Sequence, residues 1–238
     1  MSNANPNSKR WGSEDLTPTY KKRHMELYTY FRSSAAYRVR IALNLKGLKA
    51  DYRYVHLVKD GGQQHTPEYK AINPQGLVPA LVDQGHVLTQ SLAIIEYLEE
   101  THPKPPLLPK DASGRARVRA LAQLIACDIH PVNNQRILKY LEKEFGADEA
   151  ARNRWYRHWI IEGFNALEKL LSGNPATGKF CHGDQPSVAD ICLVPQVFNA
   201  RRFEIDLAPF PTIRRIHDHC LTLKAFTDAT PEKQADAG

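Results

Sequence analysis

Two adjacent serines, Ser33 and Ser34, stand where an alternating apolar stretch ends and a helical pattern begins. The alternation over residues 25–30 is typical of a strand, and a serine directly before a helical pattern is typical of an N-cap. A strand that runs straight into a helix presents several unpaired N–H groups and the positive end of the helix dipole at the edge of the sheet. Such a position favours a phosphate, a carboxylate or a thiolate.

The sequence limits where a thiolate at this position could come from. In a thioredoxin-like domain the same position would carry a Cys-x-x-Cys pair whose first cysteine is stabilised as a thiolate. The chain has no cysteine before Cys127, so a sulfur that reacts at Ser33 and Ser34 must belong to a bound cofactor. The alternative, in which the serines only cap the helix, stays open on position alone.

The elements around the serines predict a small α/β domain. The helix that they open is followed by residues 51–58, which are dense in strand formers. The Val78-Pro79 pair before the next strand indicates a tight or cis turn. Residues 80–88 predict a hairpin, and Ser91 is expected to cap the helix after it. The predicted order is therefore strand, helix, strand, loop, two strands and a helix.

Prolines interrupt this pattern and indicate a linker, beyond which the sequence holds only helical patterns. Ser187 and Asp190 form a Ser-x-x-Asp capping box at the start of one of these helices. An α/β domain followed by an all-helical domain is therefore the expected architecture. The expected bounds are 1–24 for a flexible extension, 25–102 for the α/β domain, 103–111 for the proline-rich linker, 112–228 for the helical domain and 229–238 for a flexible tail.

Composition and charge argue against several classes of function. The formal net charge is +6, and about half of it comes from residues 1–24, so nucleic-acid binding by the folded part is not expected. The four cysteines form no Cys-x-x-Cys pair, which fits reduced thiols in the cytoplasm and argues against a disulfide framework or a metal site. No apolar run reaches the roughly 18 residues of a membrane-spanning helix, and the N-terminus lacks the apolar core of a secretory signal.

Four segments resemble the zeta class of glutathione transferases: YFRSSAAYRVRIALNLKG, NPQGLVPALV, QSLAIIEYLEE and SVADICLVPQVFNARRF. This class includes maleylacetoacetate isomerases and bacterial maleylpyruvate isomerases. The resemblance runs from about Glu26 to about Phe226, and its most specific part is the motif Ser-Ser-x-x-Tyr-Arg-Val-Arg. It implies a thioredoxin-like domain that binds glutathione, an all-helical domain that completes the substrate pocket, and a homodimer.

The resemblance also implies roles for individual residues. Ser33 would hydrogen-bond the glutathione sulfur and stabilise its thiolate, and Ser34 would support it. Gln90 and Ser91 would hold the γ-glutamyl carboxylate at a second helix N-terminus. The residues expected to bind glutathione are Ser33, Ser34, Ala35, Ala36, Tyr37, Arg38, Gln64, Val78, Pro79, Gln90, Ser91, His130, Asn134, Gln135 and Arg136, while Arg32 and Arg202 are expected to bind the substrate.

Many zeta enzymes carry cysteine and tryptophan where this chain has Ala35 and Tyr37, so an auxiliary role for that cysteine is excluded here, while the serine is untouched. His130 precedes Pro131 within a helical pattern, where a kink would turn it towards the cleft between the domains. For His130, contact with glutathione or substrate and a packed or half-exposed ring both stay open. For Arg136, a contact with the ligand and a solvated surface position both stay open.

The activity that the resemblance implies is the isomerisation of maleylacetoacetate to fumarylacetoacetate in tyrosine and phenylalanine catabolism. A glutathione thiolate adds to the cis double bond, the bond becomes single and rotates, and elimination returns the thiolate and the trans isomer. A free thiol has a pKa near ~8.5, which the serine and the helix N-terminus must lower. Maleylpyruvate and other small electrophiles are alternative substrates, and a non-catalytic ligand-binding module of the same fold is a further alternative.

Overall fold

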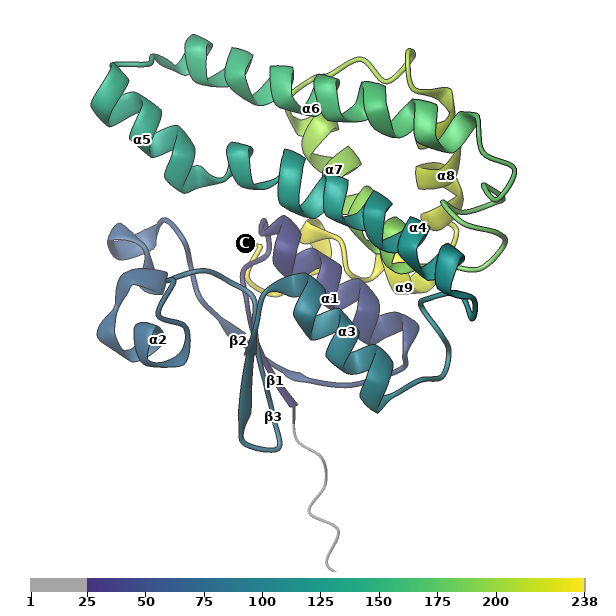
Figure 1. Cartoon of the computed structure of the whole chain (residues 1–238). Coiled ribbons are helices and arrows are strands. Elements are labelled where there is room, and N and C mark those ends of the chain that lie inside the picture. Colours follow the sequence, from purple (N-terminus) through teal and green to yellow (C-terminus); the bar gives the residue numbers. More distant parts are fainter. Residues whose placement is uncertain (1–24, 238) are drawn as a thin grey trace, which may run out of the picture.

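The computed structural model describes residues 25–237 of the chain. The extension predicted over residues 1–24 lies outside the described residues. An α/β unit is followed by a helical one, in the order that the sequence predicts (Figure 1). The elements of the α/β unit are β1 (Met25–Thr29), α1 (Ser34–Leu45), β2 (Asp51–Tyr54), the short helices η1 (Lys59–Gly61) and η2 (Gln63–His65), α2 (Pro67–Ile72), β3 (Ala80–Asp83), β4 (His86–Thr89) and α3 (Ser91–Thr101).

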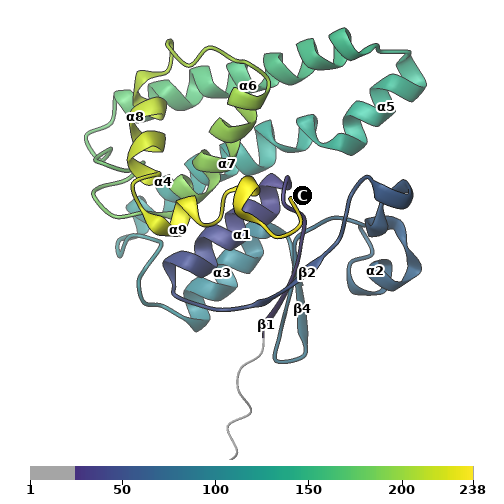
Figure 2. The same cartoon turned by 180° about the vertical axis from the view of Figure 1, so that it is seen from behind.

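The four strands form one sheet in the order β2-β1-β3-β4. β1 pairs in parallel with β2, which requires a crossover such as α1, and antiparallel with β3, while β3 and β4 form a hairpin. Figures 1 and 2 show α1 and α3 on one face of the sheet and α2 on the other side. The side chains of Leu27, Ile41 and Leu81 are fully buried in the core. This arrangement places the start of α1 next to the helical unit.

One predicted strand is shorter in the structure. The strand predicted over residues 51–58 ends at Tyr54. β1 ends at Thr29, and the Val55 N–H donates to the Thr29 carbonyl over 2.9 Å at the end of this pairing. The chain beyond Val55 has no remaining length of β1 to pair with, so it turns away into η1 and η2.

The entry to α3 also differs from the prediction. Ser91 is the first residue of the helix, and the N-cap is Gln90, whose φ of 68° lies in the left-handed region. The predicted hairpin and the cis peptide bond between Val78 and Pro79 are both confirmed.

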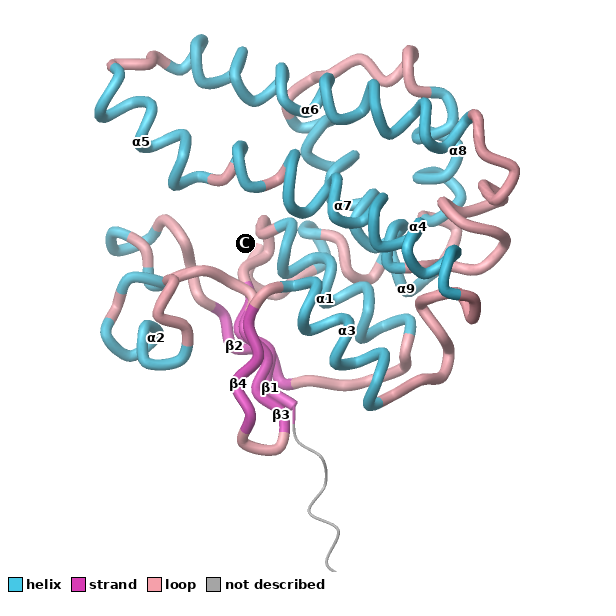
Figure 3. Tube along the Cα trace, in the orientation of Figure 1, coloured by secondary structure: helices cyan, strands magenta, loops and turns pink. Residues whose placement is uncertain are grey.

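The helical unit is built as predicted, since every strand of the described residues lies before the linker (Figure 3). The long stretch after the linker bends at His130, where a π-helical turn ends and Pro131 begins a short 3₁₀ turn. Among the helices that the structure describes, none combines the length and the apolar character that a membrane span requires. The elements are α4 (Ala112–Gln123), η3 (Leu124–Ile129), η4 (Pro131–Asn133), α5 (Gln135–Phe145), α6 (Glu149–Ser172), α7 (Val188–Arg202), α8 (Pro211–Cys220), α9 (Lys224–Thr227) and η5 (Pro231–Lys233).

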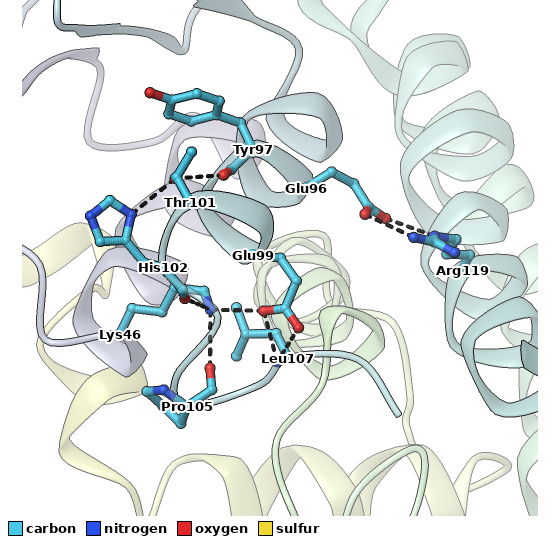
Figure 4. Close-up of polar contacts among 9 residues, drawn as sticks. All are labelled: Lys46, Glu96, Tyr97, Glu99, Thr101, His102, Pro105, Leu107 and Arg119. Carbon is cyan, nitrogen blue, oxygen red and sulfur yellow. Dashed lines mark hydrogen bonds and ion pairs between the residues drawn. The ribbon is translucent and has the colours of Figure 1, made fainter. Parts of the chain in front are cut away.

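A buried ion pair holds the linker against the α/β unit (Figure 4). Lys46 Nζ donates to Glu99 Oε2 over 2.7 Å and to the carbonyls of His102 and Pro105 over 2.7 and 3.0 Å. The Glu99 carboxylate also accepts from the Leu107 N–H, over 3.1 and 3.0 Å. A buried charge is tolerated only when it is paired and hydrogen-bonded, and this pair meets that condition.

Two further contacts join the linker region to the helices. The Leu107 carbonyl accepts from the Val188 N–H at the start of α7 over 3.0 Å. Arg119 of α4 pairs with Glu96 of α3 through two hydrogen bonds of 2.8 and 2.9 Å (Figure 4). The two units are therefore fixed relative to one another by the linker as well as by helix packing.

The sequence predicts a flexible tail over residues 229–238, but the structure orders residues 229–237. Residues 229–237 lie along α1, and the C-terminal end reaches the space between the two units (Figures 1 and 2). The buried guanidinium of Arg40 donates to the Ala229 carbonyl over 3.1 Å, and Asp236 Oδ2 accepts from the Phe31 N–H over 2.9 Å. These bonds to the α/β unit order the segment, and its polar composition alone does not indicate them.

Candidate active site

A cavity of about 1120 Å³ lies where the start of α1 faces the helical unit. The α/β unit contributes the segment between β1 and α1, the loop before α2 and the loop before β3. The helical unit contributes residues from the bend at His130, from α5 and from the end of α7. The C-terminal segment adds Pro231, Glu232 and Ala237. A pocket of this size between two domains is a typical place for a small-molecule site.

Ser33 and Ser34 both line this cavity. Ser33 is the N-cap of α1, and its Oγ accepts from the Ala36 N–H over 3.2 Å. Ser34 is the first residue of the helix, and its Oγ accepts from Asn199 Nδ2 over 2.7 Å. In both serines the oxygen accepts a hydrogen bond from the protein, so each hydroxyl keeps its proton to donate. The helix dipole adds a positive potential at the same place, and the first turn of α1 has no acidic residue to oppose it.

The structure brings about half of the other expected residues to the cavity and places the rest outside its lining. Those that line the cavity are Gln64, Val78, His130, Asn134, Gln135, Arg136, Arg32 and Arg202. Those outside the lining are Ala35, Ala36, Tyr37, Arg38, Pro79, Gln90 and Ser91.

The expected residues outside the cavity lining are kept from it for different reasons. Ala36 and Tyr37 are turned by the helix into the core, where the Tyr37 hydroxyl donates to the Phe226 carbonyl over 3.4 Å. Arg38 is also buried, and its Nη1 donates to Ser91 Oγ over 3.2 Å. Of the first helical residues, only those at the very N-terminus can face a ligand beyond the end of the helix.

Gln90 and Ser91 lie next to the cavity rather than in its lining. Gln90 Nε2 donates to Oε1 of Gln75 over 2.8 Å, and Gln75 does line the cavity. The start of α3 is therefore a second helix N-terminus beside the same space. Within the described residues, the buried Gln64 Oε1 atom on the cavity wall has no hydrogen-bond partner. A ligand with an N–H group would satisfy that acceptor.

Basic side chains outnumber acidic ones around the cavity. Arg32, Arg136, Arg202 and Lys139 line it, against the single carboxylate of Glu232 among the described lining residues. This balance favours an anionic ligand with more than one negative charge. Arg32 and Arg202 reach it from different units of the fold, so a ligand between them would contact both.

His130 meets the cavity as an uncharged ring. Burial, followed by the nearby positive charges of Arg38 and Arg136, lowers the pKa of His130 to about 3. The ring is therefore neutral near pH 7 and can act as a hydrogen-bonding group rather than as a cation. Burial also raises the pKa of Tyr30 and raises that of Tyr156 to about 12, so both phenols on the cavity wall stay protonated.

The sequence did not identify several lining residues. Lys139 lies one helical turn after Arg136, and that spacing could have indicated it. Asn199 and Glu232 carry no local sequence signal, because each reaches the cavity only through the tertiary fold. The described residues contain no cluster of side chains that could hold a metal ion. The four cysteines are free thiols, and three of them are buried.

Comparison with known proteins places the chain among glutathione S-transferases. Two family models match the chain, the glutathione S-transferase N-terminal domain over residues 27–106 and the glutathione S-transferase C-terminal domain over residues 149–220. The chain is 54% identical to a maleylpyruvate isomerase of Ralstonia sp over 214 residues, which cover 90% of this chain and 100% of that protein. It is 49% identical to the maleylacetoacetate isomerase of Mus musculus over 210 residues, which cover 88% and 94%.

Solved structures give the same result. The chain is similar to the holo structure of a maleyl pyruvate isomerase, a bacterial glutathione S-transferase of the zeta class, with a TM-score of 0.86, 54% identity and coverage of 90% and 100%. It is also similar to a maleylacetoacetate isomerase from Methylobacterium extorquens AM1 with bound malonate and GSH, with a TM-score of 0.86, 45% identity and coverage of 90% and 99%.

Proposed function

The chain belongs to the glutathione S-transferase family, in its zeta class, and we propose that it catalyses the glutathione-dependent cis–trans isomerisation of maleylacetoacetate to fumarylacetoacetate. One observation carries the proposal. Two serine hydroxyls at a helix N-terminus face a cavity that is rimmed by arginines from both units of the fold. The first feature suits a thiolate, and the second suits a substrate with two carboxylates.

The residues present fit glutathione, which carries a thiol, two carboxylates, an amino group and two amide N–H groups. Ser33 and the N-terminus of α1 would hold the sulfur. The N-terminus of α3, with Gln90 and Ser91, would hold the γ-glutamyl carboxylate beside the cavity. The unpaired Oε1 of Gln64 would accept from an N–H group of the ligand, and the backbone of Val78, which lines the cavity, would bind the cysteinyl unit.

The chain's own residues have three tasks in this reaction. When bound, glutathione supplies a thiolate that adds to the cis carbon–carbon double bond, allows rotation and then leaves. The Ser33 hydroxyl donates to the sulfur and, with the helix dipole, lowers the thiol pKa below its ordinary value. Arg32 and Arg202 hold the substrate carboxylates and stabilise the negative charge that develops on the conjugated carbonyl group. Neutral His130 lines the cavity and offers the ligand a hydrogen-bonding ring without adding charge.

Maleylpyruvate is the second candidate substrate. The chain is 54% identical to a maleylpyruvate isomerase over the full length of that protein, which favours this alternative directly. The two substrates share the cis double bond and both carboxylates and differ in the length of the keto chain. The thiol end of the cavity cannot distinguish the two substrates, so the residues that the helical unit contributes to the cavity must select between them.

The assembly and location of the enzyme belong to the same proposal. We propose a homodimer in the cytoplasm, on the basis of the zeta-class membership and of cysteines that carry no disulfide in the structure. Light scattering of the purified protein tests the first part, and a mass near twice 27.0 kDa is expected.

The deciding experiment follows the ultraviolet absorbance of maleylacetoacetate with purified protein, coupled to a fumarylacetoacetate hydrolase, with and without glutathione. Rapid loss of absorbance only in the presence of glutathione supports the proposal. A rate with maleylpyruvate but none with maleylacetoacetate assigns the second substrate. If glutathione stimulates neither reaction, nor any reaction of small electrophiles, the protein is a ligand-binding module.

A further inference from the structure

A buried hydrogen bond connects the helical unit to one of the two serines. Asn199, in the last turn of α7, donates through Nδ2 to Ser34 Oγ over 2.7 Å. Asn199 is 4% exposed and Ser34 is 6% exposed, and both line the cavity. The bond joins residues that are 165 positions apart in the sequence and belong to different units of the fold.

An asparagine at this position is costly unless its amide is paired. Most of the remaining residues of α7 are buried, and the helix packs against α1. An unpaired amide in such surroundings loses hydrogen bonds to water without replacement, which destabilises the fold. Ser34 supplies a partner, so the asparagine and the serine act as a unit.

The direction of the bond determines what Ser34 can do. A serine hydroxyl has one proton to donate and two lone pairs that accept. A serine in the first turn of a helix often turns its proton back to a nearby backbone carbonyl. When Asn199 donates to the oxygen, it occupies one lone pair, restricts the orientations of the hydroxyl and leaves the proton available to a group in the cavity. A thiolate is the acceptor that the proposed function places there.

We propose that Asn199 is a positioning residue for the thiol site: it holds Ser34 as a hydrogen-bond donor to the glutathione sulfur and thereby lowers the pKa of the bound thiol. This inference rests on the proposed function. It assigns the two serines to different kinds of support, because Ser33 is oriented by the Ala36 N–H of its own helix, while Ser34 is oriented by the helical unit. The thiol site is then complete only when α7 is docked against α1.

The test measures the pKa of glutathione bound to the protein, from the ultraviolet absorbance of the thiolate near 240 nm as the pH is varied, with no substrate present. Asn199→Leu removes the donor and keeps the number and branching of the side-chain heavy atoms, and we expect the thiol pKa to rise by about one unit, a tenfold lower thiolate fraction well below the pKa. Asn199→Asp places an acceptor and a negative charge at the same atoms, and a larger rise is expected.

Gln196→Leu is the matched control. Gln196 is a buried amide on the same helix, one turn before Asn199, and it lies outside the cavity lining. Its replacement is expected to change the melting temperature without moving the thiol pKa. A shift as large as that of Asn199→Leu would mean that any disturbance of α7 changes the site, and would overturn the specific role of Asn199.

The double variant with Ser34→Ala completes the test. If Asn199 acts through Ser34, Asn199→Leu has no further effect on the thiol pKa once Ser34 is alanine, whereas additive shifts overturn the inference. Weaker glutathione binding with an unchanged thiol pKa would also overturn it, since that is the result of a purely structural role. If Asn199→Leu does not fold, the thiol pKa is compared between Asn199→Asp and the same substitution in the Ser34→Ala background. An equal rise in both would overturn the inference. A wild-type protein that shows no bound thiolate overturns the proposed function itself, and this inference with it.

Discussion

The two walls of the cavity are built in opposite ways. The wall formed by the end of β1 and the start of α1 is held by a buried hydrogen bond from Asn199 to Ser34 and a partly buried one from the Phe31 N–H to Asp236. The opposite wall includes α5, in which every residue keeps exposed surface, and the side chains of Tyr140 and Phe145 are 57% and 72% exposed. Few buried contacts mean a low free energy of local opening, so α5 is the more adaptable wall.

This difference matches a division of chemical work. Stabilising a thiolate requires donors held within a few tenths of an ångström, and a well-packed helix N-terminus provides them. Substrates that differ only in the length of a keto chain require a wall that can adjust. The firm wall should therefore determine the rate of reaction, and the adaptable wall should determine which diacid is preferred.

The largest effect is expected at the firm wall. Ser33→Ala removes the hydroxyl that donates to the sulfur, and we expect turnover with glutathione to fall on the order of 10²–10³-fold, as for the loss of other preorganised donors. Steady-state kinetics with saturating glutathione measures this. The variant also loses the N-cap of α1, which costs about 1 kcal/mol of stability.

Asp148→Ala separates these two effects. Asp148 is the N-cap of α6 and accepts from the Ala151 N–H over 2.7 Å, and it does not line the cavity. Its loss is expected to lower the melting temperature by a similar amount and to leave turnover unchanged. If Ser33→Ala were no slower than Asp148→Ala, the serine would only cap its helix.

The next effect in size concerns substrate binding. Arg202→Gln removes a charge that reaches the cavity from the end of α7, where the guanidinium stacks 5.0 Å from the ring centre of Phe203. A charge-assisted hydrogen bond to a carboxylate contributes about 1.5–3 kcal/mol, so kcat/KM for the diacid should fall roughly 10–100-fold. The affinity for glutathione, measured by calorimetry, should stay near the wild-type value. A parallel loss of both would place Arg202 at glutathione rather than at the substrate.

A smaller effect is expected in the pH dependence of stability. The pKa of His130 is about 3 in the folded protein and near 6.5 in the unfolded chain, so as the pH falls below about 6.5 the unfolded state binds the proton first. The stability that depends on this neutral ring is complete above pH 6.5 and is lost as the pH falls towards 3, by up to about 1.4 kcal/mol per pH unit. His130→Gln should flatten this part of the curve in urea titrations between pH 4 and 7. An unchanged slope would mean that the ring protonates freely in the folded state.

How far the sequence predicts these features depends on how local their causes are. A serine N-cap for the first helix and a tight or cis turn at Pro79 follow from residue types at neighbouring positions, and the structure has Ser33 as the N-cap and a cis bond before Pro79. Asn199 and Asp236 act on the same loop through bonds that span 165 and 205 positions, and no local pattern indicates them. Ala36, Tyr37 and Arg38 illustrate the reverse case. They are adjacent to the serines in sequence and are expected at the ligand, but the helix turns them into the core.

The smallest effect is expected at the adaptable wall. Lys139 lines the cavity from α5, and exposed charges contribute about 0–1 kcal/mol, so Lys139→Gln should lower kcat/KM by no more than about fivefold. The loss should shrink further in 0.5 M salt, because exposed charges are screened over distances of a few ångströms there. A change in the ratio of kcat/KM for maleylacetoacetate and maleylpyruvate is the informative measurement. If Lys139→Gln and Arg202→Gln alter that ratio equally, α5 and the end of α7 share the selection, and a special role of the exposed helix in choosing the substrate is wrong. If only the α5 variant alters the ratio, the exposed helix selects the substrate, although it contributes little to the rate.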